Sequence, residues 1–168
     1  MEIKNGVKKI LVLLLVLLNF GCDQISKSIV RKNVEYYETT PIIQDNFILT
    51  KVENKGAFLG FGSSLHPVIK TVFLLGLPTV ALLAMLAYLL FKTNLNQYFI
   101  IGFSFIVGGG IGNIFDRILY GSVTDFLHID LGLFKTGIFN MADVSVMAGS
   151  LYILFSVIRK KYQQVKIQ

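Results

Sequence analysis

The sequence predicts an all-α membrane protein: a four-transmembrane-helix bundle with a small extracytoplasmic β-like cradle and a short interfacial helix. Two observations carry this prediction. First, 54 % of the 168 residues are hydrophobic and only 15 % are charged, whereas soluble domains carry about 25 % charged residues. Second, four apolar stretches are each long enough to cross a bilayer core of about 30 Å, which takes roughly 20 helical residues. We expect residues 1–168 to form a single membrane domain.

The expected spans cover about residues 7–30, 68–91, 98–119 and 141–158. The second span contains Pro78, which removes a helical hydrogen bond and therefore predicts a kink. The third contains Gly108 and Gly112 in a G-x-x-x-G pattern, which is typical of closely packed membrane helices.

Lys and Arg predict the side of the membrane on which each connection lies, because cytoplasmic connections are enriched in them. The N-terminal segment, the 92–97 link and the C-terminal segment together hold eight basic residues and one acidic residue, whereas the rest of the chain holds eight basic and nine acidic residues. We therefore expect both termini and the link to be cytoplasmic. Because topology accounts for the net charge of +6, the charge does not indicate a nucleic-acid partner.

Two segments then face outward. The segment from about residue 31 to 67 contains "DNFILTKVENKGAFLGFGSS", a strand-like run with glycine-rich turn signals, and this predicts a small sheet or hairpin resting on the membrane. The segment from about residue 121 to 140 is short and rich in Phe, Leu and Ile. We expect it to lie in the membrane interface as a short helix or flap.

Polar residues of three spans are expected at one depth. Asp23 lies 13 residues after Ile10, roughly 20 Å along a helix, and so in the outer half of the bilayer. A charged side chain costs about 2.5–3.5 kcal/mol at mid-bilayer, so several polar groups at one depth predict a shared polar site. The other members of this layer are Asn113, Asp116 and Arg117 at the end of the third span, Asp125 just after it, and Asn140 and Asp143 at the start of the fourth.

Spacing suggests roles for some of these residues. Asp23 and Lys27 are four residues apart and can pair on one helix face, which favours a structural over a catalytic role. Asp116 and Arg117 either form an ion pair within the bundle or leave Arg117 free to contact a substrate, and both interpretations stay open.

Neither Asp125 nor Asp143 has a Lys or Arg within one helical turn. Two carboxylates held close together cannot both ionise, and such a pair can activate a water molecule between them. This is the chemistry of aspartic proteases. The alternative, in which both carboxylates belong to a structural ion network, stays open on spacing alone.

Other chemistries have weaker support. His128 lies near Asp125 and Asp130, but one histidine with scattered carboxylates is a weak metal pattern. Cys22 is the only cysteine, so neither an internal disulfide nor a cysteine metal cluster is possible. We expect no metal and no cofactor.

Four sequence blocks then resemble a known family. The chain resembles the lipoprotein signal peptidase (signal peptidase II) family over nearly its whole length, and the third block, with G-N-x-x-D-R and V-x-D-F in one frame, is the most specific. In chain order the blocks are "DQISK" at 23–27, "ENKGAF" at 53–58, "GNIFDRILYGSVTDF" at 112–126 and "FNMADVS" at 139–145.

The resemblance implies an integral-membrane aspartyl endopeptidase of the bacterial cytoplasmic (inner) membrane, with its active site at the outer face. It would remove the signal peptide from diacylglyceryl-modified prolipoproteins, just before the lipidated cysteine. Its partners would be these substrates and membrane lipid, without nucleic acid, and it would function as a monomer. The first outer loop would be the family's small β-like cradle, and residues 126–139 would be its interfacial helix. The catalytic pair would be Asp125 and Asp143. Substrate-binding or dyad-supporting residues would be Asn54, Gly56, Asn113, Arg117 and Asn140, and structural support would come from Asp23, Lys27 and Asp116.

The N-terminal stretch "KKILVLLLVLLNFGCDQISK" itself looks like a lipoprotein cleavage signal, with basic residues, a short apolar run and Gly21 before Cys22. However, Asn19 stands where an aliphatic residue is usual, and cleavage would sever Asp23 and Lys27 from the bundle. We expect the first span to be a retained signal-anchor helix without an acyl group on Cys22.

Two rival functions remain. A small transporter or channel would distribute polar residues through the depth of the bilayer, whereas here they gather at one side. A non-catalytic scaffold would use Asp125 and Asp143 only structurally.

Overall fold

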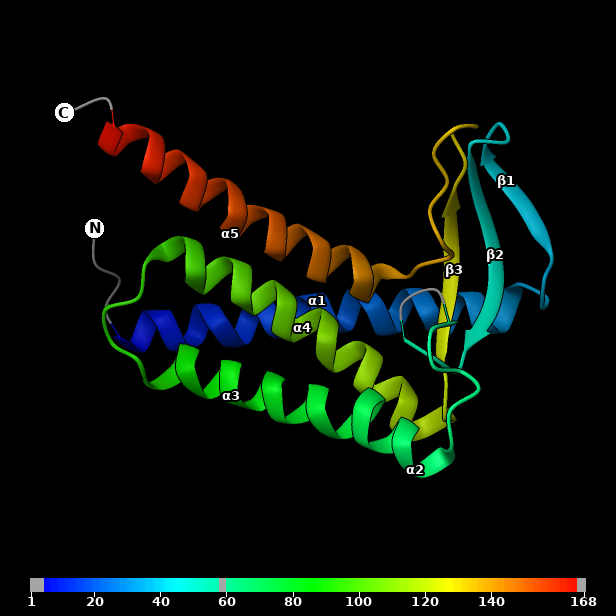
Figure 1. The fold of residues 1–168 in the computed structure, drawn as a ribbon, viewed down its shortest axis with the longest axis horizontal. Coiled ribbons are helices and arrows are strands. Elements are labelled where there is room, and N and C mark those ends of the chain that lie inside the picture. Colours follow the sequence, from blue (N-terminus) through cyan, green and yellow to red (C-terminus); the bar gives the residue numbers. More distant parts are fainter. Residues whose placement is uncertain (1–4, 58–59, 166–168) are drawn as a thin grey trace.

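Four long helices build the protein, as expected (Figure 1). The computed structural model describes residues 5–57 and 60–165. All four helices are long and apolar enough to cross a membrane. They are α1 (Asn5–Asn33), the continuous run of α2 (Pro67–Lys70), the π-helical turn η2 (Thr71–Gly76) and α3 (Leu77–Phe91), then α4 (Gln97–Tyr120) and α5 (Met141–Val165).

The second span is irregular just before Pro78. The π-helical turn ends at Gly76, and Pro78 lies in the first turn of α3. Proline donates no backbone N–H, so the ladder of hydrogen bonds must change at this point. The hydroxyl of Thr79 donates to the carbonyl oxygen of Leu75 at 2.6 Å and satisfies one of the acceptors there.

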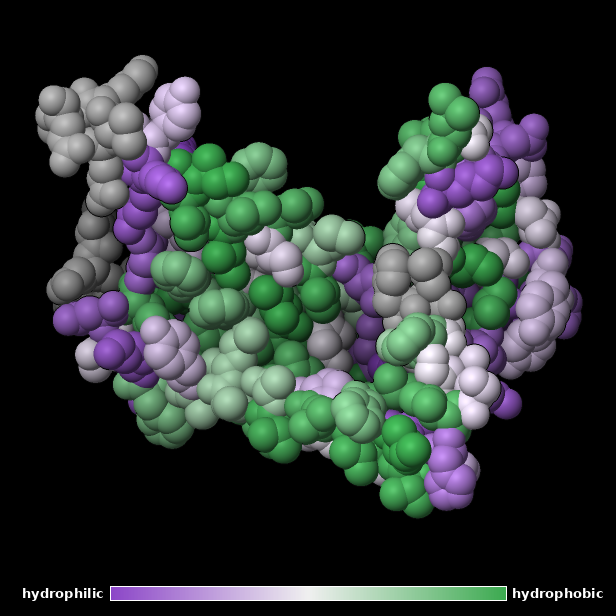
Figure 2. Space-filling model, in the orientation of Figure 1, coloured by the Kyte–Doolittle hydropathy of each residue, from purple (hydrophilic) through white to green (hydrophobic). Residues whose placement is uncertain are grey.

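Helix α4 lies at the centre of the bundle and contacts α1, α3 and α5. Glycines allow these close approaches, because a methyl group at Gly109 would overlap the carbonyl oxygen of Ala142 in α5, and one at Gly108 would overlap α1. The buried apolar cluster of the bundle consists of Val12, Val16, Leu89, Ile100 and Val107. Outward-facing residues of the helices are mostly large and apolar, and Figure 2 shows a largely hydrophobic surface on the visible face of the bundle.

A three-stranded antiparallel sheet lies at one end of the bundle, with its strands running roughly across the helix axes (Figure 1). Strands β1 (Thr39–Ile43) and β2 (Phe47–Asn54) form the expected cradle. Strand β3 (Val123–Ile129) comes from the connection between α4 and α5 and pairs with β2. Thus the cradle includes a strand from a distant part of the sequence.

The prediction of a short interfacial helix over 126–139 is wrong. These residues complete β3 and then form a turn, in which Asp130 pairs with Lys135. The backbone of Phe139 returns to pair with Leu127. The physical reason is that β2 offers backbone partners to this segment, and this non-local pairing outweighs the local tendency of an apolar segment to form a helix.

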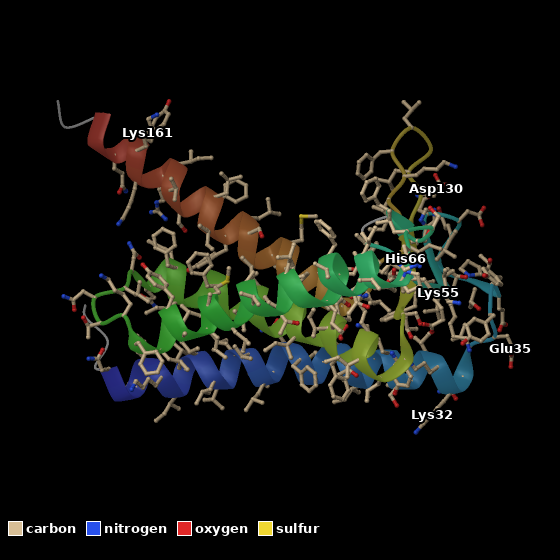
Figure 3. All side chains as sticks on the ribbon, turned by 60° about the horizontal axis from the view of Figure 1, so that its bottom comes forward. Lys32, Glu35, Lys55, His66, Asp130 and Lys161 are labelled. Carbon is tan, nitrogen blue, oxygen red and sulfur yellow. The ribbon has the colours of Figure 1, made fainter. Side chains whose placement is uncertain are left out.

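The two ends of the bundle differ in character (Figure 3). Lys32, Glu35, Lys55, His66 and Asp130 lie at the end that carries the sheet, whereas Lys161 lies near the far end of α5. The start of α1, the α3–α4 link and the end of α5 share this second end (Figure 1). The helix arrangement therefore places the described parts of the three basic segments on one side.

Candidate active site

Asp143 is held by reciprocal hydrogen bonds at the N-terminus of α5. Asn140, the residue before the helix, accepts a hydrogen bond from the backbone N–H of Asp143 at 3.0 Å through its side-chain oxygen. In return, the backbone N–H of Asn140 donates to Oδ2 of Asp143 at 3.2 Å. This is a capping box with aspartate as its acidic member, and it fixes the direction of the Asp143 side chain.

Asp125 reaches the same site from β3. The side-chain amide of Asn140 donates to Oδ1 of Asp125 at 2.6 Å, and the amide of Asn54 in β2 donates to Oδ2 at 2.9 Å. Asp125 and Asn140 are both buried. Asn140 therefore contacts both carboxyl-bearing residues, Asp125 through its amide nitrogen and Asp143 through its amide oxygen and backbone.

Three asparagine amides are oriented by donors whose identity is unambiguous. The oxygen of Asn54 accepts from the backbone N–H of Gly56 at 2.9 Å, and the oxygen of Asn113 accepts from Nζ of Lys27 at 2.9 Å. The oxygen of Asn140 accepts from a backbone N–H, as described above. Each NH₂ group must therefore point toward the acceptors of the site, and that of Asn113 donates to Asp143 at 2.9 Å.

Arg117 links the site to the loop after β2. Its guanidinium donates to the carbonyl oxygen of Gly56 at 2.9 Å and to that of Asn113 at 3.3 Å. Among the described residues, neither Asp125 nor Asp143 forms an ion pair. The guanidinium of Arg117 is therefore held by two backbone carbonyl oxygens.

Beneath the asparagines lies a buried layer of charges. Lys27 pairs with Asp23 at 2.8 Å and with Asp116 at 3.1 Å, and all three side chains are fully buried. Asp23 also accepts a hydrogen bond from the backbone N–H of Ala142 at 2.9 Å. The expected pairing of Asp23 with Lys27 is present, and Asp116 pairs with Lys27 rather than with the neighbouring Arg117.

The pKa of Asp125 is raised to about 6, chiefly because burial penalises the charged form. The hydrogen bonds from Asn54 and Asn140 act in the opposite direction, while the negative charge of Asp143 raises the pKa further. A buried carboxyl group that keeps its proton to a higher pH than an ordinary aspartate is therefore part of this site.

The comparisons with known proteins agree with this architecture. The family model described as "Signal peptidase (SPase) II" matches residues 15–159. The chain belongs to the signal peptidase II family. The expectation of a membrane-bound peptidase from this family is confirmed. The relatives described next are bacterial proteins.

Curated relatives of this signal peptidase II chain cover most of its length. The lipoprotein signal peptidase of Solibacter usitatus is 31 % identical over 88 % of the chain and 90 % of the relative. That of Chlorobium phaeobacteroides is 37 % identical over 79 % and 82 %. A solved structure described as a bacterial membrane enzyme superposes with a TM-score of 0.77 at 22 % identity, covering 95 % of this chain and 92 % of that one. This likeness shows the fold.

Sequence reasoning missed several residues of this candidate site. The amide of Gln24 donates to both Asp23 and Asp116, and Arg31 pairs with Asp116 at 2.8 Å. Arg31 also donates to the hydroxyl of Thr124 at 2.8 Å. A signal existed for Arg31, because it lies eight residues after Asp23 and therefore on the same face of α1.

Residues of the sheet joined this network without a sequence signal. Glu53 in β2 accepts hydrogen bonds from the hydroxyls of Ser122 and Thr124, at 2.5 Å and 2.8 Å. These contacts join β2 to β3 and, through Arg31, to α1. They depend on strand register, which spacing along the chain does not reveal.

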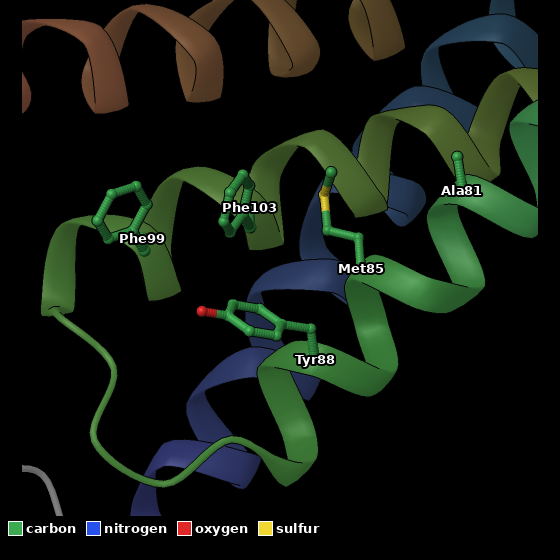
Figure 4. A pocket seen from close by; sticks show the side chains of 5 residues that line it. All are labelled: Ala81, Met85, Tyr88, Phe99 and Phe103. Carbon is green, nitrogen blue, oxygen red and sulfur yellow. The ribbon is translucent and has the colours of Figure 1, made fainter.

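Two other features lie outside the site. Nδ1 of His128 lies 3.5 Å from the carbonyl oxygen of Gly137, and no group of three or more metal-binding side chains occurs in residues 5–57 and 60–165. A groove of about 440 Å³ lies between α3 and α4 (Figure 4). It is lined by Ala81, Met85, Tyr88, Phe99 and Phe103, and it contains no carboxyl group.

Proposed function

We propose that this chain is a membrane-embedded aspartyl endopeptidase that removes the signal peptide from diacylglyceryl-modified prolipoproteins. Cleavage would occur just before the lipidated cysteine. Two curated relatives described above carry the name lipoprotein signal peptidase. The observation that carries the catalytic assignment is the double contact of Asn140, which joins Asp125 to Asp143.

Asp125 and Asp143 share the work of activating water in this proposal. In this proposal Asp125, whose pKa is raised to about 6, acts as the acid and Asp143 acts as the base. Asp143 accepts a proton from the attacking water while Asp125 donates its proton to the scissile carbonyl oxygen, which gives a neutral tetrahedral diol. When the C–N bond breaks, Asp143 returns its proton to the leaving amine of the cysteine, and Asp125 regains a proton from a diol hydroxyl.

The surrounding polar groups position the reactants. Asn54, Asn113 and Asn140 orient the two carboxyl groups. Arg117 and the backbone at Gly56 lie at the edge of the site and hold the substrate backbone, and the network around Asp23, Lys27 and Asp116 supports the arrangement from below. Neither metal nor another cofactor takes part, and one chain is sufficient.

The proposed site lies on the outer side of the bacterial cytoplasmic membrane. The reasons are that the sheet occupies one end of the bundle and the basic segments the other (Figure 1), and that basic segments favour the cytoplasm. Lipidated substrates then reach the carboxyl pair sideways from the bilayer. Cysteine labelling in intact cells tests this orientation: Glu35→Cys should react with a membrane-impermeant maleimide and Asn94→Cys should not, in a Cys22→Ser background.

The decisive experiment is cleavage of a lipidated preprolipoprotein by Asp125→Asn and by Asp143→Asn, each in membranes and followed by gel shift. Each substitution should abolish cleavage while the protein remains folded and inserted. Asp130→Asn is the matched control, because Asp130 directly follows β3 and its carboxylate contacts only Lys135 and the backbone N–H of Gly132. This variant should cleave like the wild type. Substantial turnover by either of the first two variants would refute the carboxyl pair.

A further inference from the structure

One end of the sheet carries large apolar side chains that the protein leaves exposed. The turn between β1 and β2 and the turn after β3 meet there, since Ile43 pairs with Phe47, and Phe47 pairs with Ile129. Soluble surfaces rarely gather such residues at one projecting point. The members of this apolar tip are Ile42, Ile43, Leu131, Leu133 and Phe134, which are between 50 % and fully exposed.

The turn after β3 is well constructed. The backbone N–H of Asp130 donates to the carbonyl oxygen of Asn46 at 2.9 Å, which ties the two turns together. Asp130 and Lys135 close the base of the turn with a 2.7 Å ion pair, and Gly132, with φ of 77°, allows the chain to reverse. The backbone N–H of Leu131 donates to Phe134 at 2.8 Å. Internal pairing of these backbone groups lowers the cost of taking the turn out of water.

The position of the tip follows from the helices. Arg31, in the last turns of α1, bonds to Thr124 in β3, so the sheet lies level with the end of that spanning helix. The strands run across the helix axes and carry the tip sideways past the bundle (Figure 1). Figure 2 shows hydrophobic atoms at the end of this projecting arm, which is separated from α5 by a hollow.

We propose that the apolar tip inserts into the bilayer leaflet on the sheet's side of the bundle. A sheet lying level with the membrane boundary places these side chains at the depth where apolar groups enter the headgroup and acyl region, about 5–10 Å. Phe134 enters among the acyl chains, and Lys135 stays among the phosphate groups of the lipids. The arm is thus a second membrane contact of the protein, and lipid fills the hollow between it and α5.

The test measures insertion directly. Leu133→Cys in a Cys22→Ser background is labelled with the fluorophore NBD and reconstituted in vesicles of phosphatidylcholine and phosphatidylglycerol. We expect emission shifted to shorter wavelength and loss of fluorescence when the vesicles contain lipids with a doxyl quencher near the headgroup. Phe134→Cys should behave in the same way. Glu35→Cys, on the exposed connection between α1 and β1, is the matched control and should show neither effect.

Emission from the Leu133 and Phe134 positions matching that of the Glu35 control would overturn the proposal, and it would leave a protein partner as the occupant of the tip. Because these side chains are exposed, the substitutions do not disturb packing, and a second labelled position guards against failure of one variant. No substrate enters the measurement, so its outcome is independent of the proposed peptidase chemistry.

Discussion

At the scale of single residues, Asn140 joins the parts of the site. Its amide nitrogen contacts Asp125 and Asn113, its amide oxygen caps α5, and its backbone N–H bonds to Asp143. An aspartate in its place would add a third negative charge, and an apolar residue would leave buried partners unsatisfied. Only a side chain with both a donor and an acceptor can make these contacts together.

Asn140→Ala is therefore expected to damage both activity and stability. Cleavage should fall by at least about 100-fold, as when one polarising donor is lost from an active site. Unfolding in detergent should become easier by about 1–3 kcal/mol, because buried polar groups lose their partner. The control is Asn33→Ala, since the amide of Asn33 bonds only to the carbonyl oxygen of Ile29 at an exposed position. Wild-type cleavage by Asn140→Ala would show that the two carboxyl groups need no shared contact.

The raised pKa of Asp125 predicts a pH dependence of stability. The native pKa of about 6 lies above the ordinary value of 3.8, so the native state binds the proton more tightly than the unfolded state. Stability from this group is complete below about pH 4 and is lost as pH rises through about 6. The loss is at most about 3 kcal/mol at neutral pH.

Asp125→Asn removes this titration. We expect the thermal midpoint of the variant in detergent, relative to that of the wild type, to rise as pH increases from 4 to 7. Asp130→Asn should not show this rise, because the pKa of Asp130 is lowered by Lys135 rather than raised. A constant difference between Asp125→Asn and the wild type over this pH range would contradict the assignment of a raised pKa.

At the scale of elements, the length of the apolar stretches was sufficient to predict the four spans. Each observed helix begins and ends within a few residues of the expected positions, except at the C-terminal end of α5, which extends further. The i, i+3 spacing of Asn140 and Asp143 also predicted a shared helix face. The strand β3 was not predictable in this way, because its partner β2 lies some 70 residues earlier and only the register reveals it. For the same reason, spacing placed Asp125 in the correct layer but could not bring it to Asn54.

Helix glycines offer a test of packing at this scale. A methyl group at Gly112 of α4 would overlap the carboxylate of Asp23, whereas one at Gly21 of α1 would meet nothing within 4 Å. Gly112→Ala should therefore destabilise the protein by about 1–3 kcal/mol, as overpacking does. Gly21→Ala should stabilise it by about 0.5–1 kcal/mol through helix propensity.

Thermal midpoints of the two variants in the same detergent provide the comparison. Opposite signs are expected, with Gly112→Ala below the wild type and Gly21→Ala at or above it. Equal effects would mean that α1 and α4 do not approach as closely at Asp23 as the contacts described here require.

At the scale of the whole molecule, α1 serves both ends of the bundle. Near its start, Nζ of the buried Lys8 donates to the carbonyl oxygen of Lys92 at 2.5 Å and ties α1 to the α3–α4 link. Its middle supplies Val12 and Val16 to the apolar cluster. Near its end, Lys27 and Arg31 hold the charged layer and the sheet. Cleavage before Cys22 would remove the Lys8 contact and the two valines. It would also separate Lys27 and Arg31 from the first part of the helix.

We therefore expect the mature protein to keep residues 1–21 and to carry no acyl group on Cys22, although the sequence before Cys22 looks like a lipoprotein cleavage signal. Intact-mass measurement on protein extracted from membranes checks this, with Cys22→Ser as the control. Cys22 is exposed on the helix, so the variant should accumulate normally, and its mass should differ only by the substitution. The apolar cluster cannot be completed without Val12 and Val16, which is why α1 is expected to be retained. A new N-terminus at Cys22 with a diacylglyceryl adduct, absent from Cys22→Ser, would contradict this expectation.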